Sequence, residues 1–142
     1  MANYYATARS NYFAINDLDK WEVFCEKFQL KSIMTWDNNE QINLYGFTCE
    51  NSDGGGIPNC YFDDEGEDVD DNLVEVDFIE ELSRHLQKDW VAIVMESGAE
   101  KIRYVCGFAF AVNSEGKRRT VSLTDIYAKA EKLGTHVTAA EY

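Results

Sequence analysis

The chain has 142 residues, of which 45% are hydrophobic and 13% aromatic; this is enough apolar material for a buried core and argues against disorder of the whole chain. Its 26 acidic and 13 basic residues give a formal net charge of -13, so we expect repulsion from nucleic-acid phosphates and from anionic membrane surfaces. The apolar runs fall far short of the roughly 20 residues that cross a bilayer. The first ten residues lack a basic n-region and an apolar h-region, which predicts no secretory signal and a cytoplasmic location.

The N-terminal part of the chain predicts a strand followed by a helix. Residues 3–15 are rich in Tyr, Phe and Thr, which favours a long strand in the centre of a sheet. Asn16 or Asp17 then offers a side-chain oxygen that caps a helix. Apolar residues follow at the three- and four-residue steps of an amphipathic helix that packs on a sheet: Leu18, Trp21, Phe24, Cys25 and Phe28.

A hairpin is expected next, with strands at residues 32–36 and 41–48 and a polar turn at 37–40. Three consecutive glycines, Gly54 to Gly56, then end regular structure. Residues 60–62 have the composition of a short edge strand, which tolerates the acidic run that follows because charges discourage edge-to-edge association.

The middle of the chain predicts an acidic loop and then a second helix. In residues 63–71 the like charges are too dense for a packed element, so a solvated loop is expected. Asp77 stands three residues before Glu80, which resembles an N-capping signature with acidic residues in the first helical turn. The expected buried stripe of this helix comprises Val74, Phe78, Ile79, Leu82 and Leu86.

The last third of the chain predicts three antiparallel strands and a helix. The strands are expected at residues 90–96, 101–112 and 117–122, joined by turns at 97–100 and 113–116. Each turn contains Gly together with small or polar residues, which is the composition that ends a strand.

Ser122 stands three positions before Asp125, which predicts a capped last helix. Its expected apolar stripe comprises Leu123, Ile126, Tyr127, Ala130 and Leu133. Hairpins dominate the element order and no βαβ alternation runs through it. We therefore predict a single α+β domain over residues 1–142, a mostly antiparallel sheet with about three helices packed on one face.

No established catalytic or metal-binding motif stands out. Cys49 and Cys60 flank the triple glycine, and whether they pair stays open. His85 and His136 have no adjacent nucleophile motif, so surface roles are expected for both. The four cysteines are widely spaced without a C-x-x-C pair, which is typical of buried, reduced thiols: Cys25, Cys49, Cys60 and Cys106. We accordingly predict no enzyme, no cofactor and no metal site.

Negative charge is concentrated in the middle of the chain. Residues 32–83 contain fifteen acidic residues and no Lys or Arg, which leaves only eleven of the 26 acids for the rest of the chain. Such segregation favours a surface that attracts a basic protein surface, since closely spaced carboxylates steer positive partners toward them. The predicted partner-binding residues are Asp63, Asp64, Glu65, Glu67, Asp68, Asp70, Asp71, Glu75, Asp77, Glu80 and Glu81.

Three other interpretations of the acidic block remain open. A charge run is most often a solvated loop that keeps a protein soluble. A cation or small-ligand module formed by residues 54–58 and the carboxylates is the alternative function, although the EF-hand template fails because it would place Tyr61 and Asn72 at ligand positions. A structural or regulatory protein that forms an oligomer through an exposed sheet edge is the third, and the sequence leaves the oligomeric state open.

Two end segments, YYATARSNYF at residues 4–13 and VSLTDIYAKAEKLG at residues 121–134, resemble small uncharacterised proteins encoded by bacteriophages and mobile elements. The resemblance implies a setting in which small acidic proteins inhibit host defence, including restriction and CRISPR systems, some of them as DNA mimics. The expected function is therefore a phage-like binding protein in the host cytoplasm. It would inhibit a host-defence nuclease or nucleic-acid-binding complex by presenting a carboxylate-rich, nucleic-acid-mimicking surface.

Overall fold

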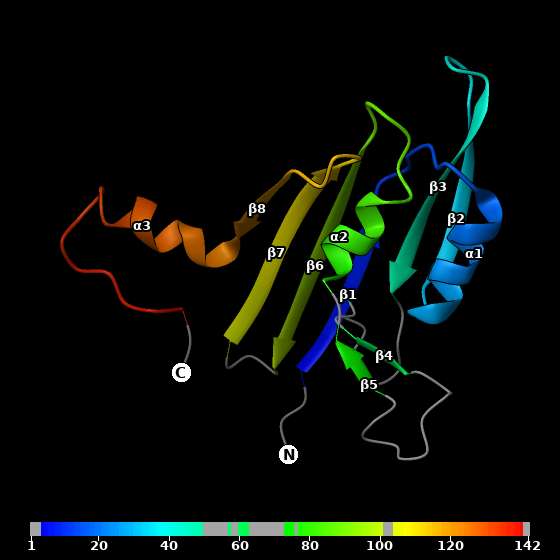
Figure 1. The fold of residues 1–142 in the computed structure, drawn as a ribbon. Coiled ribbons are helices and arrows are strands. Elements are labelled where there is room, and N and C mark those ends of the chain that lie inside the picture. The colour runs from blue at the N-terminus through cyan, green and yellow to red at the C-terminus, as the bar shows by residue number, and fades with distance from the viewer. Residues whose placement is uncertain are drawn as a thin grey trace.

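The structure, a computed structural model, describes residues 4–49, 57, 60–62, 73–75, 77–100 and 104–140. Its strands are β1 (Tyr4–Ser10), β2 (Lys31–Asp37), β3 (Ile42–Cys49), β4 (Cys60–Phe62), β5 (Leu73–Glu75), β6 (Val91–Glu100), β7 (Tyr104–Asn113) and β8 (Arg118–Ser122). Its helices are α1 (Leu18–Lys27), α2 (Phe78–Ser83) and α3 (Ile126–Ala130), the last preceded by the 3-10 turn η1 (Leu123–Asp125). Six strands form one antiparallel sheet in the order β2-β3-β1-β6-β7-β8, and β4 pairs with β5 separately (Figure 1).

Strand β1 lies inside the sheet, between β3 and β6, as its composition predicts. It ends at Ser10, five residues earlier than expected. The hydroxyl of Ser10 accepts the Phe47 N–H at 2.9 Å and donates to the Asn11 carbonyl at 2.8 Å. The chain then continues beside β3 through a single bridge between Phe13 and Tyr45. A side chain has replaced the backbone as the local hydrogen-bonding partner, which is why the strand stops there.

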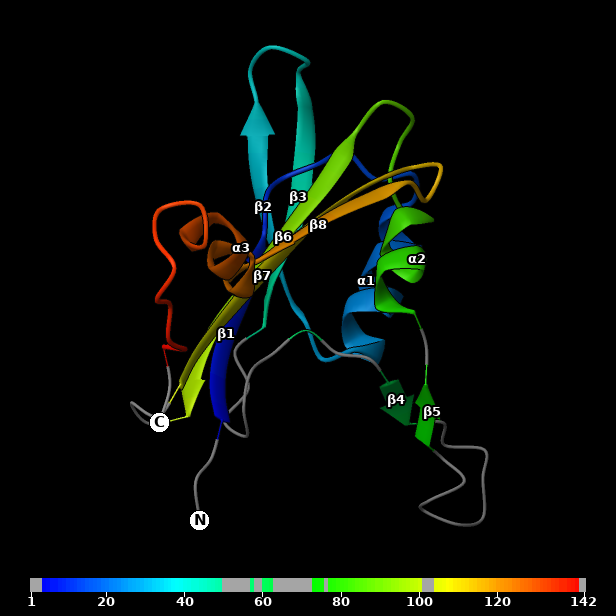
Figure 2. The same cartoon turned by 90° about the vertical axis from the view of Figure 1, so that its left-hand side faces the viewer.

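Helices α1 and α2 lie together on one side of the sheet (Figure 2). Asp17 caps α1 as predicted, accepting the Lys20 N–H at 3.2 Å. Trp21 is completely buried, with its ring 5.5 Å from those of both Phe13 and Phe24. Edge-to-face and tilted contacts between aromatic rings stabilise such a cluster beyond the burial of its apolar area. The same core also contains the rings of Phe28, Phe47, Phe78 and Phe110. The expected stripe is confirmed except for Leu18, which is 43% exposed.

Helix α2 begins at the predicted cap, Asp77, and buries the predicted residues Phe78 and Leu82. Val74, expected on the same helical stripe, instead lies in β5, where it pairs with Tyr61. The helical interpretation of Val74 was therefore wrong. A three-residue strand has no periodicity of its own, so only its pairing with β4 distinguishes it from a helix extension.

Strand β6 continues through residues 97–100, where the sequence predicts a turn. Gly98 pairs with Ala6 of β1 on one side and with Cys106 of β7 on the other. Two flanking strands supply the ladder hydrogen bonds, so tertiary pairing overrides the local turn composition of Ser97, Gly98 and Ala99. The turn at 113–116 is confirmed, with Asn113 Oδ1 accepting the N–H groups of Glu115 and Lys117.

The sequence correctly predicts an α+β domain with an antiparallel sheet, but its helices do not share one face. The C-terminal helix α3 lies on the side of the sheet opposite α1 and α2 (Figure 2). The residue that begins the turn before α3 accounts for this placement. The side chain of Leu123 lies over Gly107 of β7, so close that a Cβ on Gly107 would come within 3.0 Å of it. None of the helices in the described ranges has the length and apolar character that spanning a membrane requires.

Candidate partner-binding surface

The seven acids that precede Asn72 lie outside the described residues, but the two points where their segment attaches are defined. Phe62 of β4 pairs with Leu73 of β5, so these two residues, which flank 63–72 in the sequence, are about 5 Å apart, the Cα separation of residues that face each other across antiparallel strands. The first part of the predicted surface, Asp63, Asp64, Glu65, Glu67, Asp68, Asp70 and Asp71, thus belongs to a link between two paired strands. Glu75 closes β5 at its other end, opposite Cys60.

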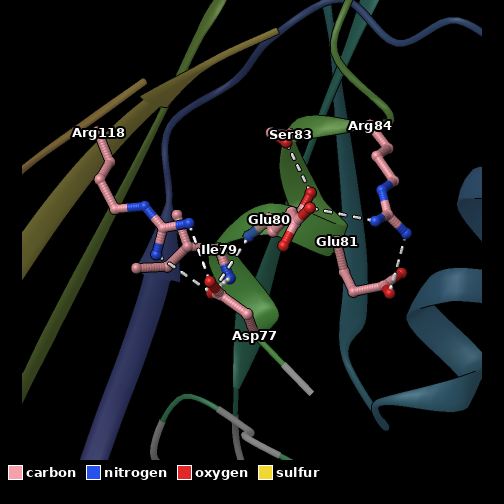
Figure 3. Close-up of polar contacts among 7 residues, drawn as sticks. All are labelled: Asp77, Ile79, Glu80, Glu81, Ser83, Arg84 and Arg118. Carbon is pink, nitrogen blue, oxygen red and sulfur yellow. Dashed lines mark hydrogen bonds and ion pairs between the residues drawn. The ribbon is translucent and has the colours of Figure 1, made fainter. Parts of the chain in front are cut away.

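The second part of the predicted surface lies on α2 and is engaged within the chain. Asp77 accepts the N–H groups of Ile79 and Glu80 at 3.2 and 3.3 Å. It also accepts hydrogen bonds from both terminal nitrogens of Arg118 in β8, at 3.2 and 2.9 Å (Figure 3). The hydrogen bond from Arg118 is the main reason that the pKa of Asp77 lies below its ordinary value. Asp77 therefore anchors α2 to the sheet as well as capping it.

Glu80 and Glu81 both meet Arg84, one helical turn away, at 3.3 and 3.2 Å (Figure 3). These are exposed pairs on a helix, which stabilise a fold by only about 0.3–0.5 kcal/mol each. Arg84 and Arg118 together balance two of the three carboxylates of Asp77, Glu80 and Glu81, so this part of the predicted surface is largely neutralised within the chain.

His85 follows α2 and is half-buried between the two helices, where the sequence predicted a surface role. Its ring centroid lies 4.6 Å from that of Phe24 and 6.0 Å from that of Trp21. Burial lowers the pKa of His85, as expected for a group whose charged form would lose hydration. This histidine is a component of the helix packing on the sheet.

Cys25 and Cys49 are buried, free thiols. Burial raises the pKa of Cys25 to about 12 and that of Cys49 to about 11, so neither is a ready nucleophile near neutral pH. Cys49 is a free thiol, with no disulfide to Cys60. Within the described ranges no three His, Cys, Asp or Glu side chains are grouped to hold a metal ion, and the Gly54 to Gly56 loop of the predicted cation module lies outside those ranges.

The sequence interpretation missed a groove on the sheet face opposite α1 and α2. It has a volume of about 660 Å³, and its lining includes Thr7, Arg9, Met95, Val121 and Leu123. A signal for it exists in the run from Val91 to Met95. Apolar residues occupy both alternating sets of positions there, a pattern typical of strands that are covered on both faces.

Comparisons of the chain with protein-family models, with curated proteins and with solved structures found no match. The resemblance of the two end segments to phage-encoded proteins stays a prediction. A function for this chain therefore has to follow from its charge distribution and from the surfaces described above.

Proposed function

We propose that this chain is a binding protein that presents residues 63–75 as a carboxylate-rich surface to a basic protein partner. The supporting observation is the charge distribution: residues 32–83 hold fifteen acids and no base, while the acids of α2 have arginine partners that come from outside this window. Solubility alone requires neither the segregation nor the complete absence of bases.

The acidic residues of this segment are closely spaced along the chain. Seven carboxylates lie within residues 63–71, between Phe62 and Leu73, which face each other across the β4–β5 pair. Unit charges within about 8 Å of one another are only partly screened at physiological salt. Such close spacing favours a concentrated negative potential, which raises the rate of association with a positive surface.

A protein that normally binds nucleic acid is the partner class this surface fits. Duplex DNA carries one negative charge per about 1.7 Å of its axis, and its binding proteins offer Lys and Arg in matching grooves. A densely acidic segment competes for the same groove, whereas the chain itself, with net charge -13, is repelled by the nucleic acid. In a phage setting the partner is a host-defence nuclease or a related complex, and the chain acts as its inhibitor without catalysis.

The test is a triple charge reversal at Asp68, Asp70 and Asp71 to Lys, with a matched control at Asp19, Glu22 and Glu26. The control residues are exposed on α1 and change the net charge by the same amount. Tagged wild type and both variants are used to capture partners from bacterial lysate at about 0.1 M and about 1 M salt, where the Debye length falls from roughly 10 to 3 Å.

Capture by the wild type at low salt, its loss at high salt and its displacement by duplex DNA are the expected results. The α1 control should capture the same partner, and the reversal of residues 68, 70 and 71 should abolish capture without changing the circular dichroism spectrum. Equal capture by both variants, or capture that high salt and DNA leave unchanged, would reject residues 63–75 as the binding surface.

A further inference from the structure

We propose that the sheet face opposite α1 and α2 is the interface of a homodimer, with the C-terminal helix of each copy docked on the groove of the other. This face, called the outer face, comprises the outward side chains of β1, β6, β7 and β8. The C-terminal arm is residues 123–140, which include η1 and α3. The inference uses no residue of the acidic segment 63–75.

Large apolar side chains are unusually exposed on the outer face. Met95 is 60% exposed and Val105 65% exposed, although both lie in the middle strands β6 and β7. Single exposed apolar residues are normal, but monomeric proteins rarely expose contiguous apolar patches of more than a few hundred Å². The other members of the patch, each at least 36% exposed, are Val91, Ile93 and Val121.

The C-terminal arm also exposes apolar side chains, which could cover such a patch. Ser122 and Asp125 form a complete capping box, so the start of the helix is well specified by the sequence. Nevertheless η1 and α3 bury no residue, and Ile126 and Leu133 are 59% and 92% exposed. Isolated helices shorter than about 12 residues are marginal in water and depend on tertiary packing. A five-residue helix with an apolar stripe therefore needs a surface to cover it.

The groove supplies that surface in a second copy. Leu123 already contacts the outer face at Gly107, which fixes where the arm leaves its own sheet. The groove of about 660 Å³ beside it has room for several aliphatic side chains. Because an apolar stripe and an apolar groove occur on the same chain, a two-fold axis makes the same contact twice, which is how closed dimers are formed.

The charge distribution favours a second copy as the occupant. Two chains of net charge -13 repel each other through their acidic surfaces. The described outward side chains of β1, β6, β7 and β8 include Arg9 and Arg119 and no Asp or Glu. On the arm, Lys129 and Lys132 balance the acids Asp125 and Glu131. Like-charge repulsion is therefore weakest where the apolar residues are exposed.

The experiment measures the mass of the full chain by sedimentation equilibrium and by light scattering, over about 1 to 100 μM, a range that detects micromolar dissociation constants. The expected mass is twice the 16.2 kDa of one chain. Two variants test the two halves of the interface: Ile126→Asp with Leu133→Asp on the arm, and Met95→Asp on the sheet. Val23→Asp is the matched control, because Val23 is 64% exposed on α1, on the other side of the sheet.

Both interface variants should be monomeric, and the Val23 variant should remain dimeric. Urea unfolding of each variant at low concentration checks that the substituted side chains, all of them exposed in the single chain, leave the fold intact. A wild-type chain that is monomeric throughout the concentration range overturns the proposal, as does a dimer that survives both interface substitutions. The triple reversal at Asp68, Asp70 and Asp71 should retain the dimer mass, so failure of the acidic surface and failure of the dimer are distinguishable.

Discussion

The two faces of the six-stranded sheet differ in burial, although the same strands form both. Val94 and Ala92 of β6 are completely buried under α1 and α2, whereas their neighbours Met95 and Ile93 are 60% and 36% exposed on the outer face. All four side chains are apolar, so hydrophobicity alone does not assign them to the core. Burial on the inner face provides the stability of the chain, while the outer face has apolar surface left for association.

The largest expected contrast between the faces is in the cost of removing a side chain. Trp21→Ala should lower the free energy of unfolding by about 3–5 kcal/mol, because it removes a buried ring and leaves a cavity. Met95→Ala on the outer face should cost less than about 1 kcal/mol in the monomer, because its side chain is mostly in water already. Urea unfolding at low protein concentration measures both, and equal costs would show that the outer face is as well packed as the inner one.

Two glycines provide a contrast of intermediate size. A Cβ on Gly46 would overlap the backbone carbonyl oxygen of Asn11 and lie 2.8 Å from Ser10 Oγ. Gly46→Ala should therefore destabilise the chain by about 1–3 kcal/mol, as overpacking against a rigid neighbour does.

Gly107→Ala on the outer face should cost less than about 1 kcal/mol in the monomer, since the atom it meets belongs to the movable side chain of Leu123. The same urea titrations provide the comparison. A larger cost for Gly107→Ala than for Gly46→Ala would mean that Leu123 and the C-terminal arm are held as rigidly as the backbone around β1.

The two helix caps give the smallest contrast. Asp77→Ala should cost about 1–2 kcal/mol, as the loss of an N-cap does, because α2 holds Phe78 and Leu82 in the core. Ser122→Ala removes the corresponding cap of η1 but should lower the global stability by less than about 0.5 kcal/mol in the monomer, since neither η1 nor α3 buries a residue.

The stability that Asp77 contributes should also depend on pH. Its folded pKa lies below the ordinary value, so its stabilisation is present above about pH 4 and is lost as the pH falls through the lower, folded pKa. Unfolding of the wild type and Asp77→Asn should thus differ most at neutral pH and converge in acid. A difference that grows on acidification would contradict the role of the Arg118 pair.

Local patterns predicted most elements because their signals are short-range. The caps at Asp17, Asp77 and Ser122 are all present, since an N-cap requires only a side-chain oxygen and the N–H groups two or three residues later. The pairing of β5 with β4 and the extension of β6 through Gly98 were not predicted. In both, another strand supplies the hydrogen bonds, and the periodicity of the segment itself does not record them.

For the candidate surface, the sequence already contained the decisive quantity, the charge. The absence of any Lys or Arg from residues 32–83 is visible in the composition alone. The arginine that offsets Asp77 is different. Arg118 is 41 residues away from Asp77 along the chain, and only the packing of α2 against β8 brings the two together.

By itself the sequence determined the α+β class, the hairpins, the helix starts and the concentration of negative charge, because composition and near-neighbour spacing fix each of these. The tertiary structure alone decided which apolar stripe is buried. The stripes of α1 and of the C-terminal helix are alike in their spacing, yet the first packs under the aromatic core and the second leaves Leu133 92% exposed. The physical reason is that amphipathicity specifies that a helix has an apolar side, whereas the surface that covers this side is assembled by strands distant in sequence.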